Sequence, residues 1–199
     1  MKKLIIFDLD GTLIDSLPDI AGAMNQALSD WGMKNRTIAE IKRFIGSGTL
    51  KLVERACDGN IPEGLIEAYR RHYDNNLLTS TTAYLGVSEV LNQLRDRHLA
   101  VVTNKYQSAA EWIINQLFPD TFDEVIGDGR FPRKPDPAAI HYLMEKYQVS
   151  PEQSVLIGDS RVDQATAKNA GIEFICVAWG YDILTKALEL DELIHRLST

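Results

Sequence analysis

Cysteine is scarce in this sequence, and its scarcity excludes two kinds of small domain. Only Cys57 and Cys176 occur among the 199 residues, and they form no CxxC pair. A disulfide framework needs more cysteines, and a cysteine-based zinc site needs them closer together. We therefore expect a protein with reduced thiols, located in the cytoplasm.

Long apolar runs and an excess of basic charge are also missing. The run after the N-terminal lysines ends at Asp8, too early for a signal peptide, and no other run approaches the length of a membrane span. Lysine and arginine number 21 against 28 acidic residues, a formal net charge of -7. This balance argues against nucleic acid or a membrane as a partner. We expect a small-molecule partner, bound by a few local groups, and a monomer or weak homodimer.

Short apolar runs alternate along the chain with helical patterns, and this alternation predicts a parallel sheet flanked by helices. Hydrophobic residues make up 45% of the sequence, which is enough for a packed core. The expected strands are the apolar runs at residues 4–7, 99–102, 124–126, 155–157 and 174–177. Helical spacings follow at residues 109–117, 138–147 and 164–170, and Gly171 is expected to end the last of these helices. The predicted fold class is α/β, with a doubly wound parallel sheet.

One segment interrupts this alternation, because no strand pattern occurs between the first strand and a helix expected near Gly86. The segment instead predicts helices at residues 19–31, 37–45, 49–57 and 62–78. Thr37 and Glu40 have the spacing of a capping box. We expect residues 1–15 and 83–199 to form the α/β core and residues 16–82 to form an all-helical cap inserted after the first strand. Ligands bind at the carboxyl ends of parallel strands, so the cap is expected to cover a site.

Two carboxylates, Asp8 and Asp10, stand at the end of the first apolar run. A strand that ends at Phe7 would place Asp8 at the carboxyl edge of the sheet, with Asp10 on the loop beyond it. Gly11 permits the sharp turn that such a loop requires. Taken alone, the pair is more often an Asx-turn that ends a strand.

Three other segments favour a chemical interpretation. The second apolar run ends in Thr103 and Asn104, whose hydroxyl and amide groups can donate to a phosphate. Lys134 lies in a proline-rich loop before a helix, where it is either solvated or turned inward onto a carboxylate. Asp159 and Asp163 stand at a third junction of strand and helix. Capping of that helix by Asp159 or by Ser160 is the structural alternative.

The carboxyl ends of these strands are expected to share one crevice, and there Asp8, Asp10, Asp159 and Asp163 would repel one another by several kcal/mol. A cation is therefore required. A ligand set that contains only oxygen selects a hard ion, and Mg²⁺, which keeps waters and shares its ligands with substrate phosphate, fits best.

The order of these motifs carries a resemblance that extends over nearly the whole chain. The sequence contains, in order, FDLDGTLIDS, VVTNK, RKPDP and GDSRVD. In this order the motifs resemble those of the haloacid dehalogenase (HAD) superfamily, whose core is Rossmann-like. Within it the chain looks like the phosphoglycolate phosphatase group, which has a helical cap. Two shorter matches to that group are IGSGTLKLVERA and VAWGYD.

The resemblance assigns roles to the acidic residues. Asp8 would be the nucleophile that forms an aspartyl phosphate, and Asp10 would act as general acid and then as general base. Mg²⁺ would be bound by Asp8, by the backbone carbonyl of Asp10 and by Asp159. Asp163 would hold the ion or its waters.

The resemblance also assigns the phosphate contacts. Thr103, Asn104 and Lys134 would bind the phosphoryl oxygens, and Lys134 would orient Asp8. In the cap, Gly46 and Ser47 form a loop that we expect to contact the leaving group. Arg43 and Lys51 flank that loop; a simple helix–helix turn with solvated cations is the alternative.

The expected function is Mg²⁺-dependent hydrolysis of a small phosphomonoester such as 2-phosphoglycolate. Pyrophosphate is another possible substrate of the same chemistry. The β-phosphoglucomutases of the superfamily typically have a histidine about a dozen residues after the nucleophile, where this chain has Ile20. Hydrolysis is therefore favoured over a mutase reaction. A non-catalytic sensor of a phosphorylated ligand is the remote alternative, since Asp8 and Asp10 are both present.

Overall fold

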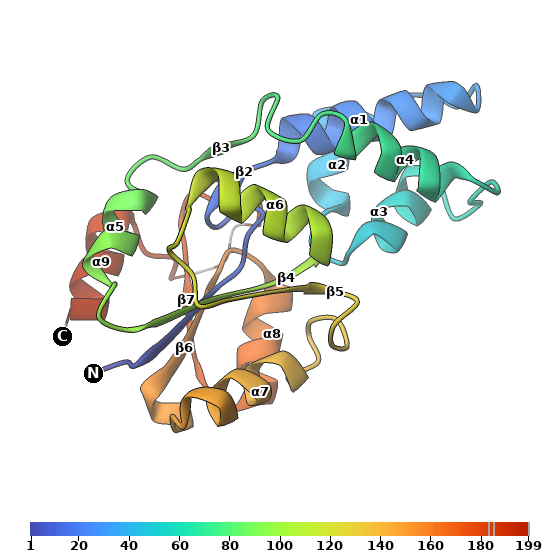
Figure 1. Ribbon diagram of the computed structural model, residues 1–199. Helices are drawn as coiled ribbons and strands as arrows, with labels where there is room; N and C mark the ends of the chain where they lie inside the picture. Colours follow the sequence, from blue (N-terminus) through green and yellow to red (C-terminus); the bar gives the residue numbers. More distant parts are fainter. Residues whose placement is uncertain (183, 185, 199) are drawn as a thin grey trace.

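Five parallel strands form the central sheet of the computed structural model, which describes residues 1–182, 184 and 186–198. The strands are β1 (Leu4–Phe7), β4 (His98–Tyr106), β5 (Glu124–Asp128), β6 (Ser154–Gly158) and β7 (Glu173–Cys176), in the order β5-β4-β1-β6-β7. All five coincide with the predicted apolar runs, and the α/β fold class is confirmed (Figure 1). Positions 183, 185 and 199 of the predicted core lie outside the described residues.

Alternation along β1 explains why helices cover both faces of the sheet. Ile5 and Phe7 pack with α5 (Val87–Gln93), α6 (Gln107–Leu117) and α9 (Leu190–Ser198). Leu4 and Ile6 pack on the opposite face with α7 (Ala138–Tyr147) and α8 (Arg161–Ala170). A strand that is buried on both faces reads as a continuous apolar run. A short 3₁₀ turn (Pro151–Gln153) leads into β6, and Gly171, at φ +71°, ends α8 as predicted.

Four of the five described helices between β1 and β4 gather beyond one end of the sheet (Figure 1). They are α1 (Leu17–Asp30), α2 (Ile38–Phe44), α3 (Thr49–Ala56) and α4 (Leu65–Asp74). Their buried faces form a separate hydrophobic cluster. Among the described buried members of this cluster, only Ala109 of α6 comes from outside the segment. The predicted capping box of Thr37 and Glu40 is present. The proposed boundaries of a cap at residues 16–82 stay a prediction.

This segment differs from the sequence prediction in the bounds of a helix and in its strands. The last helix is Leu65–Asp74 rather than residues 62–78, and it begins later because Gly64 has φ +82°, which does not belong to a right-handed helix. Two short strands also lie between β1 and α5, where the sequence predicts none. β3 (Thr82–Ala83) pairs antiparallel with β2 (Ile14–Asp15), and strands of two residues are too short to give a sequence period.

The described helices include none that is both long and apolar enough to span a lipid bilayer.

A buried carboxylate fixes the point where the chain returns from α4 to the sheet. Asp19, in the first turn of α1, is 6% exposed. It accepts hydrogen bonds from the backbone N–H groups of Ser80 (2.9 Å) and Thr81 (2.8 Å) and from the Thr81 hydroxyl (2.7 Å). The outgoing and returning segments are therefore joined at Asp19 as well as by β2 and β3.

We expect Asp19→Ala to lower the free energy of unfolding by about 3 kcal/mol, because it leaves the buried N–H and hydroxyl donors of Thr81 without an acceptor. The measurement is urea denaturation followed by circular dichroism. Asp30→Ala is the control from the same helix, since Asp30 is 42% exposed and its ion pair with His72 should contribute under about 1 kcal/mol. Equal losses in the two variants would contradict the role assigned to Asp19.

Candidate active site

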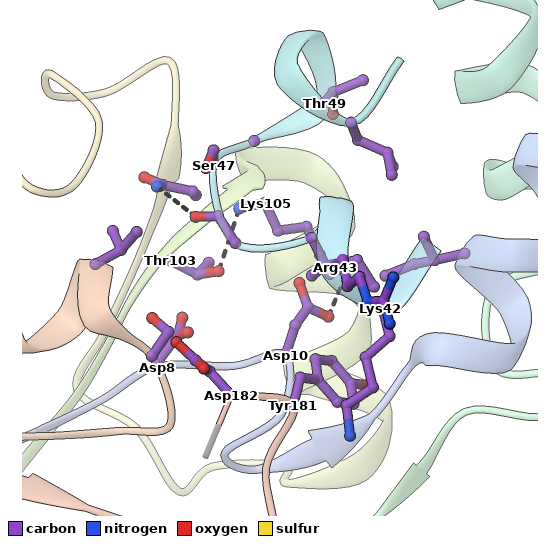
Figure 2. Close-up of a pocket in the computed structure, with 18 of the residues that line it drawn as sticks. Asp8, Asp10, Lys42, Arg43, Ser47, Thr49, Thr103, Lys105, Tyr181 and Asp182 are labelled. Atoms are coloured by element: carbon purple, nitrogen blue, oxygen red, sulfur yellow. Dashed lines mark hydrogen bonds and ion pairs between the residues drawn. The ribbon is translucent and has the colours of Figure 1, made fainter. Parts of the chain in front are cut away.

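A cavity of about 630 Å³ separates the carboxyl ends of the strands from helices α2, α3 and α4. Figure 2 shows Asp8 and Asp10 on one side of it and Ser47 and Thr49 on the other. The predicted site residues that line it are Asp8, Asp10, Gly46, Ser47, Thr103, Asn104 and Asp159. Lys134 and Asp163, at 7% and 0% exposure, are buried beside Asp8. The structure thus brings the predicted residues from distant segments to one place.

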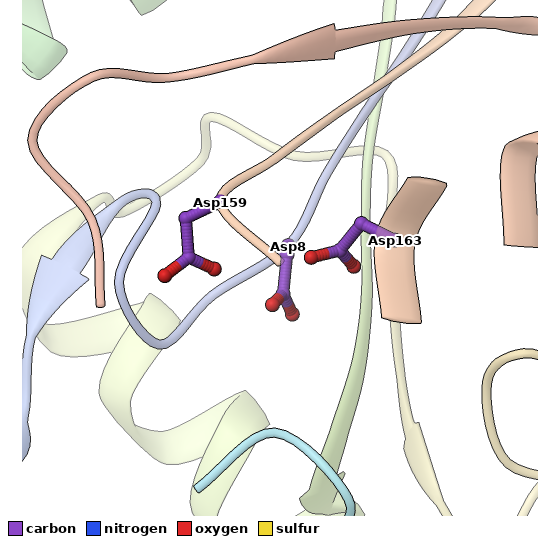
Figure 3. Close-up of side chains that lie close together, drawn as sticks. All are labelled: Asp8, Asp159 and Asp163. Carbon is purple, nitrogen blue, oxygen red and sulfur yellow. The ribbon is translucent and has the colours of Figure 1, made fainter. Parts of the chain in front are cut away.

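Three carboxylates meet at the end of the sheet (Figure 3). Asp8, Asp159 and Asp163 each offer an oxygen, and these oxygens all lie within 4.8 Å of one another. Lys134 Nζ lies 2.8 Å from Oδ1 of Asp8 and 2.6 Å from Oδ1 of Asp163. Lys134 is therefore turned inward, and its buried ammonium contacts two of the three carboxylates.

The electrostatics of this cluster favour a bound cation. Burial and the neighbouring carboxylates raise the pKa of Asp8 to about 7 and that of Asp159 to about 8. Burial acts to lower the pKa of Lys134, but Asp163 and Asp8 outweigh it and raise that pKa. The donors are carboxylate oxygens, the ligands of a hard divalent ion. The residues present fit such an ion.

Asp163 has a structural role as well. Its Oδ2 accepts hydrogen bonds from the N–H (3.1 Å) and the hydroxyl (2.5 Å) of Ser160, which is the N-cap of α8. Of the two residues proposed as caps of this helix, Ser160 is the one that caps it. Since Oδ1 of Asp163 contacts Lys134, both oxygens already have partners.

Two glycines leave room for Asp159. A Cβ on Gly11, which has φ +84°, would lie 2.3 Å from Oδ2 of Asp159. A Cβ on Gly180 would lie 2.1 Å from the Asp159 Cβ. Both contacts are far below van der Waals distance, so this carboxylate requires glycine at the two positions.

The side chain of Asp10 lies outside the cluster of three carboxylates. Its Oδ1 accepts a hydrogen bond from the Ser16 hydroxyl (2.5 Å) and contacts Lys105 Nζ (3.0 Å). Both contacts are with the same oxygen, and no described residue donates a hydrogen bond to Oδ2. The carboxyl is therefore held in one orientation on the wall of the cavity (Figure 2).

Thr103 and Asn104 differ in what they can offer a phosphate. The Asn104 amide donates to the carbonyls of Gly46 (3.0 Å) and Lys134 (3.1 Å), so no amide hydrogen is left for a phosphate in this arrangement. The Lys134 N–H donates in turn to Oδ1 of Asn104 (2.8 Å). Thr103 Oγ1 accepts from the Lys105 N–H (3.2 Å), which leaves its hydroxyl hydrogen to donate. Asn104 fixes two loops, and Thr103 remains a donor.

The loop between α2 and α3 lines the cavity as expected, but its cations are arranged differently. Arg55 donates to the Phe44 carbonyl (2.8 Å) and to the Ser47 hydroxyl (3.2 Å), which holds the loop closed. Arg43 lines the cavity. Lys51 forms an ion pair with Glu54 (2.5 Å) at the surface instead. For Lys51 the structure agrees with the alternative of a solvated cation.

Two candidate functional residues, Lys105 and Tyr181, were not predicted, although both lie inside the motifs VVTNK and VAWGYD. Lys105 follows Thr103 and Asn104 and is buried in the cavity wall. Tyr181 donates its N–H to Oδ2 of Asp159 (2.6 Å), and its hydroxyl oxygen accepts from the N–H groups of Ser16 (2.7 Å) and Leu17 (2.9 Å). It thereby connects the carboxylate cluster to the chain entering α1.

Comparison with known proteins gives the family. The model of the haloacid dehalogenase-like hydrolases matches residues 5–177. The chain is 36% identical over 201 residues to the phosphoglycolate phosphatase of Nitrosospira multiformis, covering 95% of this chain and 88% of that protein. A solved structure from Lactobacillus delbrueckii subsp. bulgaricus has a TM-score of 0.89 at 28% identity and 99% coverage of both chains. Another, described as a predicted phosphoglycolate phosphatase from Haemophilus somnus, has a TM-score of 0.88 at 30% identity, covering 100% of this chain and 98% of that one.

The chain belongs to the haloacid dehalogenase-like hydrolase family. Within that family it is phosphoglycolate phosphatase-like, and it is an enzyme of the phosphatase class, a phosphoric monoester hydrolase. The resemblance and the enzyme class predicted from the sequence are confirmed.

At about pH 9, above the raised pKa of Asp159, and in the absence of divalent cations, we expect Asp159→Asn to raise the melting temperature by about 2–4 °C, because it removes one like charge from a buried cluster. The measurement is thermal unfolding in a chelator and then with a divalent cation, which should stabilise the unsubstituted protein more than the variant. Asp182→Asn is the control, since Asp182 lines the cavity but is 44% exposed. A lower melting temperature for Asp159→Asn in the chelator would refute the repulsion.

Proposed function

We propose that the protein is a Mg²⁺-dependent phosphatase that hydrolyses a small phosphomonoester such as 2-phosphoglycolate through an aspartyl phosphate on Asp8. The observation that supports this most directly is the arrangement of Asp8. It lies beside Lys134 and Asp159 at the edge of a cavity whose wall also carries Asp10. The relatives named phosphoglycolate phosphatase support the choice of substrate.

The first step requires an ionised Asp8 facing phosphorus. The ammonium of Lys134, 2.8 Å from Oδ1, favours the ionised carboxylate and fixes its orientation. A carboxylate oxygen of Asp8 attacks phosphorus, a new P–O bond forms, and the bond from phosphorus to the leaving-group oxygen breaks. The Thr103 hydroxyl and the ammonium of Lys134 are the candidates to donate hydrogen bonds to the phosphoryl oxygens.

Asp10 is the proposed proton donor to the leaving group. Ser16 and Lys105 hold its Oδ1, so Oδ2 is the oxygen to carry the transferred proton. After the leaving group departs as an alcohol, the Asp10 carboxylate takes a proton from water. The water oxygen attacks phosphorus, the bond to Asp8 breaks, and inorganic phosphate is released with Asp8 regenerated.

Asp8, Asp159 and the backbone carbonyl of Asp10 would hold Mg²⁺, with Asp163 supporting the site. When bound, the ion offsets the negative charge of the phosphate against that of the nucleophile. The helices of residues 16–82 are proposed to close over the substrate about the paired strands β2 and β3, and so to exclude water during the first step.

We expect Asp8→Asn to lower phosphate release by about 10³-fold or more, because the amide cannot attack phosphorus. The panel consists of 2-phosphoglycolate, pyrophosphate, hexose phosphates and nucleoside monophosphates, each with Mg²⁺ and with a chelator. Asp96→Asn, at a carboxylate that is 68% exposed, is the control and should keep full activity.

The panel also separates the alternatives. Release from pyrophosphate alone would make the protein a pyrophosphatase. Conversion of one hexose phosphate into another without net release would make it a mutase, and binding without turnover would make it a sensor. Any of these three results overturns the proposal.

Asp10→Asn tests the proton transfer separately. Removing a general acid costs about 10²–10⁴-fold with a poor leaving group. We therefore expect the rate of the first turnover to fall by that factor with 2-phosphoglycolate. With p-nitrophenyl phosphate the same rate, measured as the burst of product, should fall much less, because its leaving group needs no proton. Equal losses in the first turnover of the two substrates would exclude Asp10 as the acid.

A further inference from the structure

The cavity wall contains a second buried ammonium, which orients Asp10 in the proposed chemistry but has no assigned contact with the substrate. Among the described residues, two lysines are buried, Lys134 and Lys105, at 7% and 8% exposure. Lys134 is committed to the carboxylate cluster. Lys105 lies on β4 two residues after Thr103, and both side chains line the cavity.

The contacts of Lys105 leave one ammonium hydrogen for a ligand. Nζ lies 3.0 Å from Oδ1 of Asp10 and donates to the Tyr73 hydroxyl at 2.8 Å. It also lies 4.6 Å from the centre of the Tyr73 ring. An ammonium has three donors, and these partners use two of them. The described residues offer no third acceptor, and the side chain lines the cavity (Figure 2).

The other cations that line the cavity are less suited to hold a small leaving group. They are Lys42, Arg43, Arg55 and Arg161, none of which is buried. Arg55 is already bonded to the loop that it closes, and Arg161 is 82% exposed. A buried ammonium binds an anion more strongly than an exposed one, because water screens it less.

The contact between Lys105 and Asp10 indicates which part of the substrate would lie next to Lys105. Asp10 must reach the ester oxygen to protonate it, so an ammonium in contact with the same carboxyl lies beside the first atoms of the leaving group. In a phosphate ester of a 2-hydroxy acid, the carboxylate is attached to the carbon that bears the ester oxygen. That carboxylate would therefore lie on the Lys105 side of the cavity.

We propose that Lys105 determines specificity for the leaving group by binding this carboxylate, so that the preferred substrates are phosphate esters of small 2-hydroxy acids. This inference rests on the proposed phosphatase function. Tyr73 comes from α4, so the group that reads the substrate is held between the sheet and the helices that cover it.

The experiment compares two esters that differ only in the group of interest, 2-phosphoglycolate and 2-hydroxyethyl phosphate. The second has an alcohol where the first has a carboxylate. We expect the unsubstituted enzyme to prefer 2-phosphoglycolate by about 10²-fold in kcat/KM. Lys105→Met should abolish that preference, because it loses about 10²-fold more activity toward 2-phosphoglycolate than toward 2-hydroxyethyl phosphate; any loss through the contact with Asp10 should be equal for the two esters. Lys105→Arg should retain the preference. Lys42→Met, which removes a half-buried cation that lies over the ring of Tyr181, should leave the ratio unchanged within about threefold.

The outcomes separate the inference from the proposed function. Equal losses for both esters in Lys105→Met would overturn the inference and limit Lys105 to orienting Asp10. An unchanged ratio would also overturn it. If the unsubstituted enzyme hydrolyses neither ester, the proposed function itself fails. Lys105→Gln keeps a donor for Asp10 and Tyr73, and it provides the same comparison if the methionine variant does not fold.

Discussion

The mutual repulsion of three buried carboxylates is the constraint on which the rest of the site depends. Asp8, Asp159 and Asp163 lie within 4.8 Å of one another at the end of a sheet whose strands are buried on both faces. Such an arrangement is unstable unless positive charge is supplied, and the fold supplies one ammonium, that of Lys134. One ammonium does not balance three carboxylates, so the remaining charge is available to bind a cation. The same imbalance that weakens the fold therefore gives the site its affinity for a metal.

The position of Lys134 depends in turn on a residue that carries no charge. Asn104 accepts a hydrogen bond from the Lys134 N–H and donates to its carbonyl, and the same amide donates to Gly46 in the loop between α2 and α3. One side chain at the end of β4 thus fixes the lysine of the cluster and a loop on the opposite side of the cavity. Tyr181 performs a similar task between Asp159 and the chain that enters α1. Through these two residues the carboxylate cluster is connected to the loop between α2 and α3 and to the start of α1.

The sequence predicted the strand ends well and the connections between them poorly. Asp8, Thr103 and Asp159 follow apolar runs that are buried on both faces, so their position at one edge follows from the strand pattern alone. The commitment of Asn104 to two carbonyls was not predictable, because its partners lie 30 and 58 residues away in loops. Strands β2 and β3 were missed because two residues give no period. Local pattern reveals which residues stand at an edge, whereas the contacts made there depend on loops that carry no pattern.

In the proposed function, the two buried lysines would divide the recognition of a charged ester between them. Lys134 contacts Asp8 and would bind the phosphoryl group, whereas Lys105 contacts Asp10 and would bind the leaving group. Each ammonium would then contact the carboxylate that acts on its own part of the substrate. A ligand that lacks either negative group would leave a buried ammonium without one of its partners, which is unfavourable at a site removed from water. Discrimination between substrates would then arise from the cost of an unpaired buried charge, with no need for the cavity of about 630 Å³ to fit the leaving group closely.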